Sequence, residues 1–253
     1  MKPDWTSGFS MRVHMCRAVV LLATIFSAVA LDAASPAANL DVDLALVLAF
    51  DVSGSVSPRR FDLQREGYAT AFASPQLIGA IRSTNHRAIA VTLVEWSGAY
   101  QQEQVIGWTL IDDEASSKAF GRAIAEVPRS FYGRTSISGA VDYCVALFQQ
   151  SGFANQRRVI DVSGDGSNND GSPVTDARDK AVAIGLTING LPILSEESSL
   201  GDYYRDNVIG GPGSFVLEVR EFSHFGDAVL RKLLREIAGD GDKLKATALS
   251  AKD

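Results

Sequence analysis

Residues 44–55 read LALVLAFDVSGS, and this stretch decides the fold. The apolar run at 44–50 is unbroken, which is typical of a strand buried on both faces of a parallel sheet. It ends at Asp51, and a polar loop that contains glycine follows. We therefore predict a central strand at 44–50 whose carboxyl end presents Asp51 at one edge of a sheet.

Strands and helices alternate along the rest of the chain. Ser57 and Pro58 are favourable residues for a helix start, and this helix is predicted to run to about Ser74. We expect further strands at 88–96, 103–110 (an edge strand), 157–163, 186–191 and 214–219. We expect further helices at 113–126, 136–148, 173–184 and 225–237. Because such alternation implies crossover connections, the predicted fold class is α/β: a doubly wound, mostly parallel, Rossmann-like central sheet with helices on both faces.

Polar residues fall where such a sheet binds its ligands. In an open α/β sheet the ligand crevice lies beyond the carboxyl ends of the central strands. Asp51 ends one predicted strand, Asp165 follows another, and Thr135 precedes the helix that starts near Ser136. We therefore expect Asp51, Asp165 and Thr135 at the same edge of the sheet.

The loop DVSGS at 51–55 carries one carboxylate and two hydroxyls on alternate residues. Alternation turns Asp51, Ser53 and Ser55 to one side, and Gly54 leaves room for the backbone to curl around a small centre. Such oxygen ligands suit a hard cation that completes its shell with water. Mg²⁺ fits best, with Mn²⁺ and Ca²⁺ as alternatives. The same residues also favour an ordinary turn after a strand, without any metal.

These motifs together resemble the von Willebrand factor type A family and its metal-ion-dependent adhesion site. That family has D-x-S-x-S after the first strand, a threonine in a loop before a helix, and an aspartate followed by glycine after a later strand. The matching residues are DVSGS at 51–55, GRT at 133–135 and GDG at 164–166, and the resemblance covers roughly residues 43–238. Ser163-Gly164 is a departure, because many members carry an apolar residue and threonine there. An exported bacterial subfamily without assigned function is most similar.

The resemblance implies a set of metal ligands and a role for the metal. Ser53 and Ser55 would bind the ion directly, Thr135 directly or through water, and Asp51 and Asp165 mainly through water. An ion held in this way stays electrophilic and accepts an acidic group. The resemblance thus implies a metal-dependent protein-binding module, for adhesion or scaffolding, whose partner presents a carboxylate.

Two other functions stay open on the same fold: a metal-dependent hydrolase that uses the same crevice, and a scaffold that binds no metal. The sequence contains no P-loop, G-x-G-x-x-G, G-x-S-x-G or H-E-x-x-H motif. No base is placed by the sequence beside Ser53 or Ser55 to activate a nucleophile. We therefore expect that the protein is not an enzyme.

The net charge and the N-terminal segment indicate the class of partner and the cellular location. The formal net charge is −6 with a pI near 5.1 and no stripe of basic residues, which argues against a nucleic-acid partner. Residues 1–34 are interpreted as a signal peptide and linker, because basic residues precede an apolar run at 18–31 that is shorter than the ~20 residues of a membrane span. We expect a periplasmic or secreted protein with no membrane span after cleavage, a domain at 40–239 and a polar tail at 240–253.

Overall fold

The computed structural model describes residues 40–239, without the side chains of residues 155 and 156. The expected signal peptide and linker at 1–34 and the expected tail at 240–253 lie outside the described residues. Among residues 40–239, no helix is long and apolar enough to cross a membrane.

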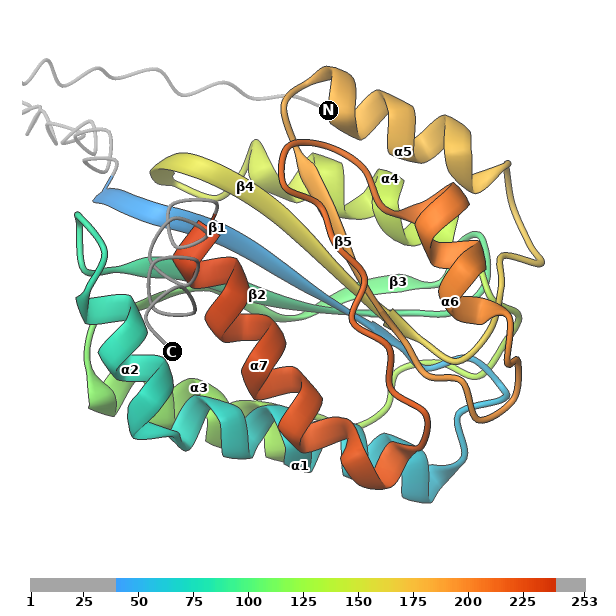
Figure 1. The fold of residues 1–253 in the computed structure, drawn as a ribbon, viewed down its shortest axis with the longest axis horizontal. Coiled ribbons are helices and arrows are strands. Elements are labelled where there is room, and N and C mark those ends of the chain that lie inside the picture. Colours follow the sequence, from blue (N-terminus) through green and yellow to red (C-terminus); the bar gives the residue numbers. More distant parts are fainter. Residues whose placement is uncertain (1–39, 240–253) are drawn as a thin grey trace, which may run out of the picture. The chain divides into compact units, whose positions relative to one another are not determined.

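A five-stranded sheet with the order β3-β2-β1-β4-β5 forms the centre of the described domain (Figure 1). The strands are β1 (Leu40–Asp51), β2 (Ile89–Trp96), β3 (Gln102–Ile111), β4 (Phe153–Gly164) and β5 (Thr187–Pro192). β1 pairs in parallel with β2 and with β4, and β4 pairs in parallel with β5, whereas β3 is antiparallel to β2 at the edge. The prediction of a doubly wound, mostly parallel sheet with an edge strand near 103–110 is confirmed.

β1 is buried on both faces, as its unbroken apolar run predicts. Alternate side chains of a strand point to opposite faces of the sheet, so one strand contributes to two separate cores. One core receives Leu44, Leu46, Leu48 and Phe50. The other receives Ala45, Val47 and Ala49. The central position of β1 therefore fixes Asp51, its last residue, at the carboxyl edge of the sheet.

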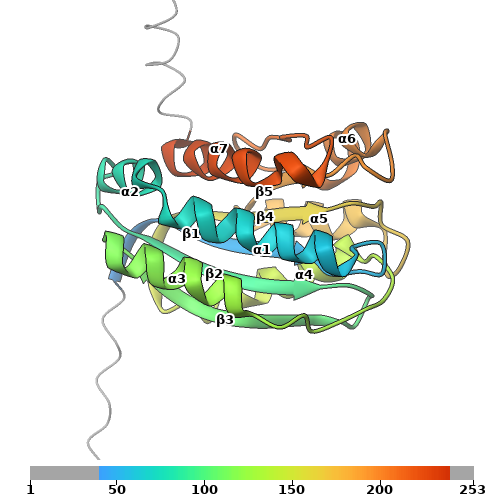
Figure 2. The same cartoon turned by 90° about the horizontal axis from the view of Figure 1, so that it is seen from below.

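Helices cover each face of the sheet, as Figure 2 shows from below. One core contains side chains of α1 (Pro58–Ala73), α2 (Pro75–Arg82), α3 (Glu114–Glu126) and α7 (Phe225–Ala238). The other contains side chains of α4 (Ile137–Phe148), α5 (Val174–Ala183) and α6 (Leu200–Tyr203). This is the predicted two-sided arrangement. The sequence did not indicate α2, which begins at a second Ser-Pro pair directly after α1.

The prediction of a strand at 214–219 is wrong, because this segment forms only isolated bridges, from Val216 to Gly190 of β5 and from Val219 to Ile193 directly after β5. Leu217 N donates to Gly190 O at 3.0 Å and Val219 N donates to Pro192 O at 3.0 Å. Pro192 has no N–H with which to return a bond, so a continuous ladder cannot form at that position. The segment therefore lies beside β5 without forming a strand.

A buried ionic cluster fastens α7 to the sheet. Lys232 Nζ forms an ion pair with Asp161 of β4 and another with Glu236 Oε1 at 2.5 Å. Asn189 Nδ2 donates to Glu236 Oε1 at 3.1 Å, and the Tyr68 hydroxyl of α1 donates to Asp161 Oδ2 at 3.4 Å. All these side chains are buried. The cluster thus joins two helices and two strands beneath one face of the sheet.

Candidate metal centre

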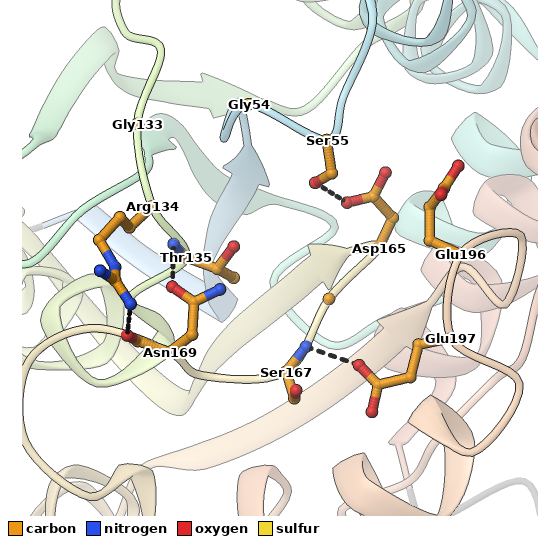
Figure 3. A pocket seen from close by; sticks show the side chains of 11 residues that line it. Gly54, Ser55, Gly133, Arg134, Thr135, Asp165, Ser167, Asn169, Glu196 and Glu197 are labelled. Atoms are coloured by element: carbon orange, nitrogen blue, oxygen red, sulfur yellow. Dashed lines mark hydrogen bonds between the residues drawn. The ribbon is translucent and has the colours of Figure 1, made fainter.

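Three loops meet at the carboxyl edge of the sheet. β1 ends at Asp51, which is paired with Trp96 at the end of β2. Asp165 follows β4 directly, and Thr135 lies in the loop before α4. Figure 3 shows Ser55, Thr135 and Asp165 around one depression. The structure therefore brings the residues that the sequence singled out to the same edge.

Hydrogen bonds connect four of the five candidate residues. Ser53 N donates to Asp51 Oδ1 at 2.7 Å, and this bond turns the chain sharply after β1. The Ser53 and Ser55 hydroxyls lie 3.2 Å apart, and the Ser55 hydroxyl donates to Asp165 Oδ1 at 2.5 Å. Asp51, Ser53, Ser55 and Asp165 thus form one continuous polar network.

Thr135 completes the set from the other side. A Cβ atom added to Gly166 would lie 3.8 Å from Thr135 Oγ1, so the hydroxyl faces the loop that carries Asp165. Thr135 N donates to Asn169 Oδ1 at 3.0 Å, and Thr135 O accepts from Asn169 N at 2.8 Å. Ser136 caps α4 by accepting from Gly139 N. The Thr135 hydroxyl is therefore not needed as the helix cap.

Arg129 supports the loop after β1, and no sequence motif indicated this role. Its guanidinium group donates to the carbonyl oxygens of Val52, Ser53 and Val56, each at 2.6 Å. A planar guanidinium can bind several acceptors at once, which a lysine ammonium cannot do with the same geometry. Arg129 therefore fixes the backbone that presents Ser53, although 76 residues separate the two in the sequence.

Arg60 and Glu196 form an ion pair at the rim of the depression, again without a signal in the sequence. Arg60 Nη1 lies 3.5 Å from Asp165 Oδ2 and donates to Ser55 O at 3.1 Å. Its other terminal nitrogen is paired with Glu196. Asp165 thus has one cationic neighbour, at a distance that gives a weak hydrogen bond.

Electrostatics leave the two aspartates short of positive charge. Burial, together with the nearby charge of Asp165, raises the pKa of Asp51 to about 7. Burial also raises the pKa of Asp165, opposed by the Ser55 hydroxyl and by Arg60. Asp51 Oδ2 is buried and has no hydrogen-bond partner. A buried, unpaired carboxylate oxygen is costly unless a cation or a donor satisfies it.

The residues present fit a hard divalent cation. Within the described chain, no cluster of three or more His, Cys, Asp or Glu side chains is placed to hold a metal. Two carboxylates and three hydroxyls at this edge are oxygen donors, which Mg²⁺, Mn²⁺ and Ca²⁺ accept. The depression has a volume of about 580 Å³ and is lined in part by Ser55, Thr135, Asp165, Glu196 and Glu197. It is large enough to admit an ion with its water and a side chain from outside.

Solved structures of several other proteins have a similar fold, among them the following three. Proximal thread matrix protein 1 of the mussel byssus, with a zinc-occupied MIDAS motif, is 16% identical with a TM-score of 0.55 and is covered to 48%. The von Willebrand factor type A protein of Catenulispora acidiphila is 14% identical with a TM-score of 0.56 and is covered to 43%. The pilus adhesin SpaC of Lactobacillus rhamnosus GG is 14% identical with a TM-score of 0.55 and is covered to 30%. Each match covers 78% of this chain, which spans less than half of each matched chain.

The described domain therefore has a von Willebrand factor type A-like fold. Residues 41–241 match the family described as "Protein of unknown function (DUF1194)", and the chain belongs to this family. No curated protein matches the sequence. The expected family resemblance is thus confirmed for the fold.

Proposed function

We propose that this protein is a divalent-metal-dependent protein-binding module. The observation that carries the proposal is the polar network of Asp51, Ser53, Ser55 and Asp165, in which a buried carboxylate oxygen lacks any partner. With Thr135, these residues would hold Mg²⁺, or Mn²⁺ or Ca²⁺, at the edge of the sheet. The ion supplies a Lewis-acidic position that a carboxylate of the partner can occupy.

The protein partner is supported by two exposed tyrosines at this edge. Tyr100 is 98% exposed and lies in the turn between β2 and β3, and Tyr132 is 66% exposed in the loop before α4. Ser136 N donates to Ser97 O at 2.7 Å, so the turn and the loop lie side by side. Tyrosine and arginine are enriched at protein interfaces. A partner that reaches the metal would therefore meet an aromatic rim.

Tyr132 is also held in place, which lowers the entropic cost of using it in an interface. The guanidinium carbon of Arg129 lies 3.8 Å from the centre of the Tyr132 ring. A stacked, preformed aromatic side chain loses less rotamer freedom on binding than a mobile one. Arg129 thus connects the backbone of the proposed metal loop to the proposed contact surface.

The solved structures with this fold support the same class of function. They include a byssal matrix protein with a zinc-occupied MIDAS motif and a pilus adhesin. At 14–16% identity this similarity demonstrates the fold, and the function is carried over here as a proposal. A periplasmic or secreted location agrees with the expected signal peptide and with the byssal matrix and pilus proteins that share this fold.

A hydrolase on the same edge is less well supported. A general base should stand free, within hydrogen-bond reach of a metal-bound water. The acidic side chains beside the proposed ligands are Glu196, which is paired with Arg60, and Glu197, which accepts from Ser167 N at 3.1 Å. Both are engaged by the protein itself, so we favour binding over catalysis.

Titration calorimetry with Mg²⁺ and Mn²⁺ tests the metal half of the proposal. The wild-type protein should release heat that saturates, and Asp51→Ala should abolish it. Asp142→Ala, an exposed aspartate of α4, is the matched control and should bind like the wild type. Equal heats from Asp51→Ala and wild type would refute the site, and the absence of any heat would favour a metal-free scaffold.

The partner half is tested by affinity capture from the exported fraction. A partner should be retained by the wild-type protein in Mg²⁺ and lost when a chelator is added. Thr135→Ala should lose it even with Mg²⁺. Retention that is unaffected by both the chelator and the substitution would show that the metal is not used for the grip.

A further inference from the structure

A second buried polar group, the Tyr204 hydroxyl, lies near Asp51 at the end of β4. Tyr204 begins the π-helical turn Tyr204–Val208, directly after α6. Its side chain is completely buried, and its hydroxyl has no hydrogen-bond partner. The Asp51 Oδ2 atom is equally buried and equally unpaired. A buried donor and a buried acceptor, each unsatisfied, therefore occur in the same part of the domain.

The two unpaired oxygens flank one point above Gly164. A Cβ atom at Gly164 would lie 2.9 Å from Asp51 Oδ2 and 2.9 Å from the Tyr204 hydroxyl. The two oxygens do not hydrogen-bond to each other, but oxygens this close to a common point are within reach of a single bridging water. Gly164 is the position at which the resemblance expects a threonine. Its missing side chain leaves room for both oxygens.

The backbone is shaped to bring the tyrosine there. A Cβ atom at Gly190 of β5 would lie 2.6 Å from the Tyr204 ring, so the ring lies against bare backbone. Ile209 N donates to Tyr204 O at 3.0 Å, which is the wider bond of a π-helical turn. Such turns are rare and are frequently found at functional sites. Two glycines and an uncommon turn thus accommodate one buried phenol.

We infer that Tyr204 is a positioning residue of the proposed metal centre, whose hydroxyl is linked to Asp51 Oδ2 through one bridging water and orients that carboxylate toward the ion. This inference rests on the proposed function. Groups that hydrogen-bond to metal ligands fix ligand orientation and commonly contribute tenfold or more to metal affinity. The phenol stays neutral and can donate, because burial raises the pKa of Tyr204 well above its usual value.

A purely structural role predicts something different. If Tyr204 only fills the space over Gly190, the ring is the whole contribution and the hydroxyl is dispensable. Tyr204→Phe separates the two roles, because it keeps the ring and removes one oxygen. Tyr143→Phe is the matched control: its hydroxyl accepts from Gln104 N at 3.2 Å, where α4 meets β3, and lines no part of the depression.

The experiment measures Mg²⁺ affinity by calorimetry for wild type, Tyr204→Phe, Tyr143→Phe and Ser53→Ala, with urea unfolding in chelator for each. Tyr204→Phe should bind Mg²⁺ about tenfold more weakly than wild type. Its free energy of unfolding in chelator should equal that of wild type or be slightly higher. The electron paramagnetic resonance spectrum of bound Mn²⁺ should also differ from wild type in Tyr204→Phe and should be unchanged in Tyr143→Phe.

The outcomes distinguish this inference from the proposed function. Tyr204→Phe affinity within twofold of wild type, while Ser53→Ala loses the ion, overturns the role of Tyr204 and leaves the metal centre intact. A wild-type protein that binds no Mg²⁺, or Ser53→Ala that binds normally, overturns both. An equal loss of affinity in Tyr143→Phe would also overturn the inference, because the effect would then not be specific to the hydroxyl beside Asp51.

Discussion

The Ser55 hydroxyl donates a hydrogen bond to Asp165 Oδ1, although 110 residues separate the two in the sequence. Ser55 lies in the loop after β1, and Asp165 follows the neighbouring strand β4. The bond holds both loops together through protein groups alone. The proposed ligands are therefore organised before an ion binds, which reduces the cost of forming the site.

Arg60→Gln should strengthen Mg²⁺ binding. The guanidinium group lies 3.5 Å from Asp165 Oδ2, so its positive charge competes with an ion for the same carboxylate. Removing a nearby like charge is worth on the order of 1 kcal/mol, or roughly threefold to tenfold in affinity. Calorimetry at low salt measures this, with the exposed neighbour Arg59→Gln as control. Weaker binding by Arg60→Gln would mean that Arg60 helps to hold Asp165 for the metal.

Arg129→Lys should weaken both the fold and the metal centre. The lysine keeps the charge but cannot donate to three carbonyl oxygens of the loop after β1 at once. We expect a loss of about 2–4 kcal/mol in the free energy of unfolding, measured in urea with chelator, because buried acceptors lose charged donors. Arg122→Lys, on the exposed side of α3, should change stability by less than about 0.5 kcal/mol. Equal stability of the two variants would contradict the assigned role.

Lys232→Met should be among the most destabilising single substitutions. It leaves the buried carboxylates of Asp161 and Glu236 without their shared cation, at a cost of about 3–5 kcal/mol. Lys118→Met removes an exposed ion pair with Glu114 and should cost less than about 1 kcal/mol. Thermal and urea unfolding of both variants measure the contrast. A loss for Lys232→Met no larger than that for Lys118→Met would show that the buried cluster is unimportant for stability.

The same cluster should make stability depend on pH. Burial, together with the neighbouring Asp161, raises the pKa of Glu236 to about 7. The folded protein then keeps a proton that the unfolded chain loses near 4.5. The stabilisation from this proton is complete below 4.5 and is lost as the pH rises through about 7. Glu236→Gln carries no titrating proton at this position. The free energy of unfolding of wild type minus that of this variant, measured in chelator, should therefore fall between pH 4.5 and about 7. A constant difference would contradict the assignment.

Much of the fold followed from local patterns. The unbroken run at 44–50 predicted a strand buried on both faces, because an unbroken apolar run of that length fits no half-exposed strand. Strand and helix alternation then predicted the parallel sheet. The strand expected at 214–219 failed because of a property of its neighbour: Pro192 lacks the N–H that a ladder needs. The residue pattern within one segment does not show whether the neighbouring strand has the backbone N–H groups needed to pair with it.

The candidate site divides in the same way. Asp51, Ser53 and Ser55 could be proposed from one loop. Asp165 could be proposed from its place after a strand, and Thr135 from its place before a helix. Their supporting residues could not. Arg129 and Tyr204 reach the loop and Asp51 only through the three-dimensional arrangement of distant segments, and neither lies in a recognisable motif. Residues that support ligands are thus harder to find from sequence than the ligands themselves.

The most direct test of the central claim is a crystal structure of the protein grown with Mn²⁺, with anomalous scattering measured for the metal. The proposed centre predicts one strong anomalous peak at the carboxyl edge of the sheet, about 2.0–2.3 Å from the hydroxyl oxygens of Ser53 and Ser55 and close to Thr135, Asp51 and Asp165. A peak held by Glu196 and Glu197 instead, or no peak at this edge at saturating Mn²⁺, would contradict it.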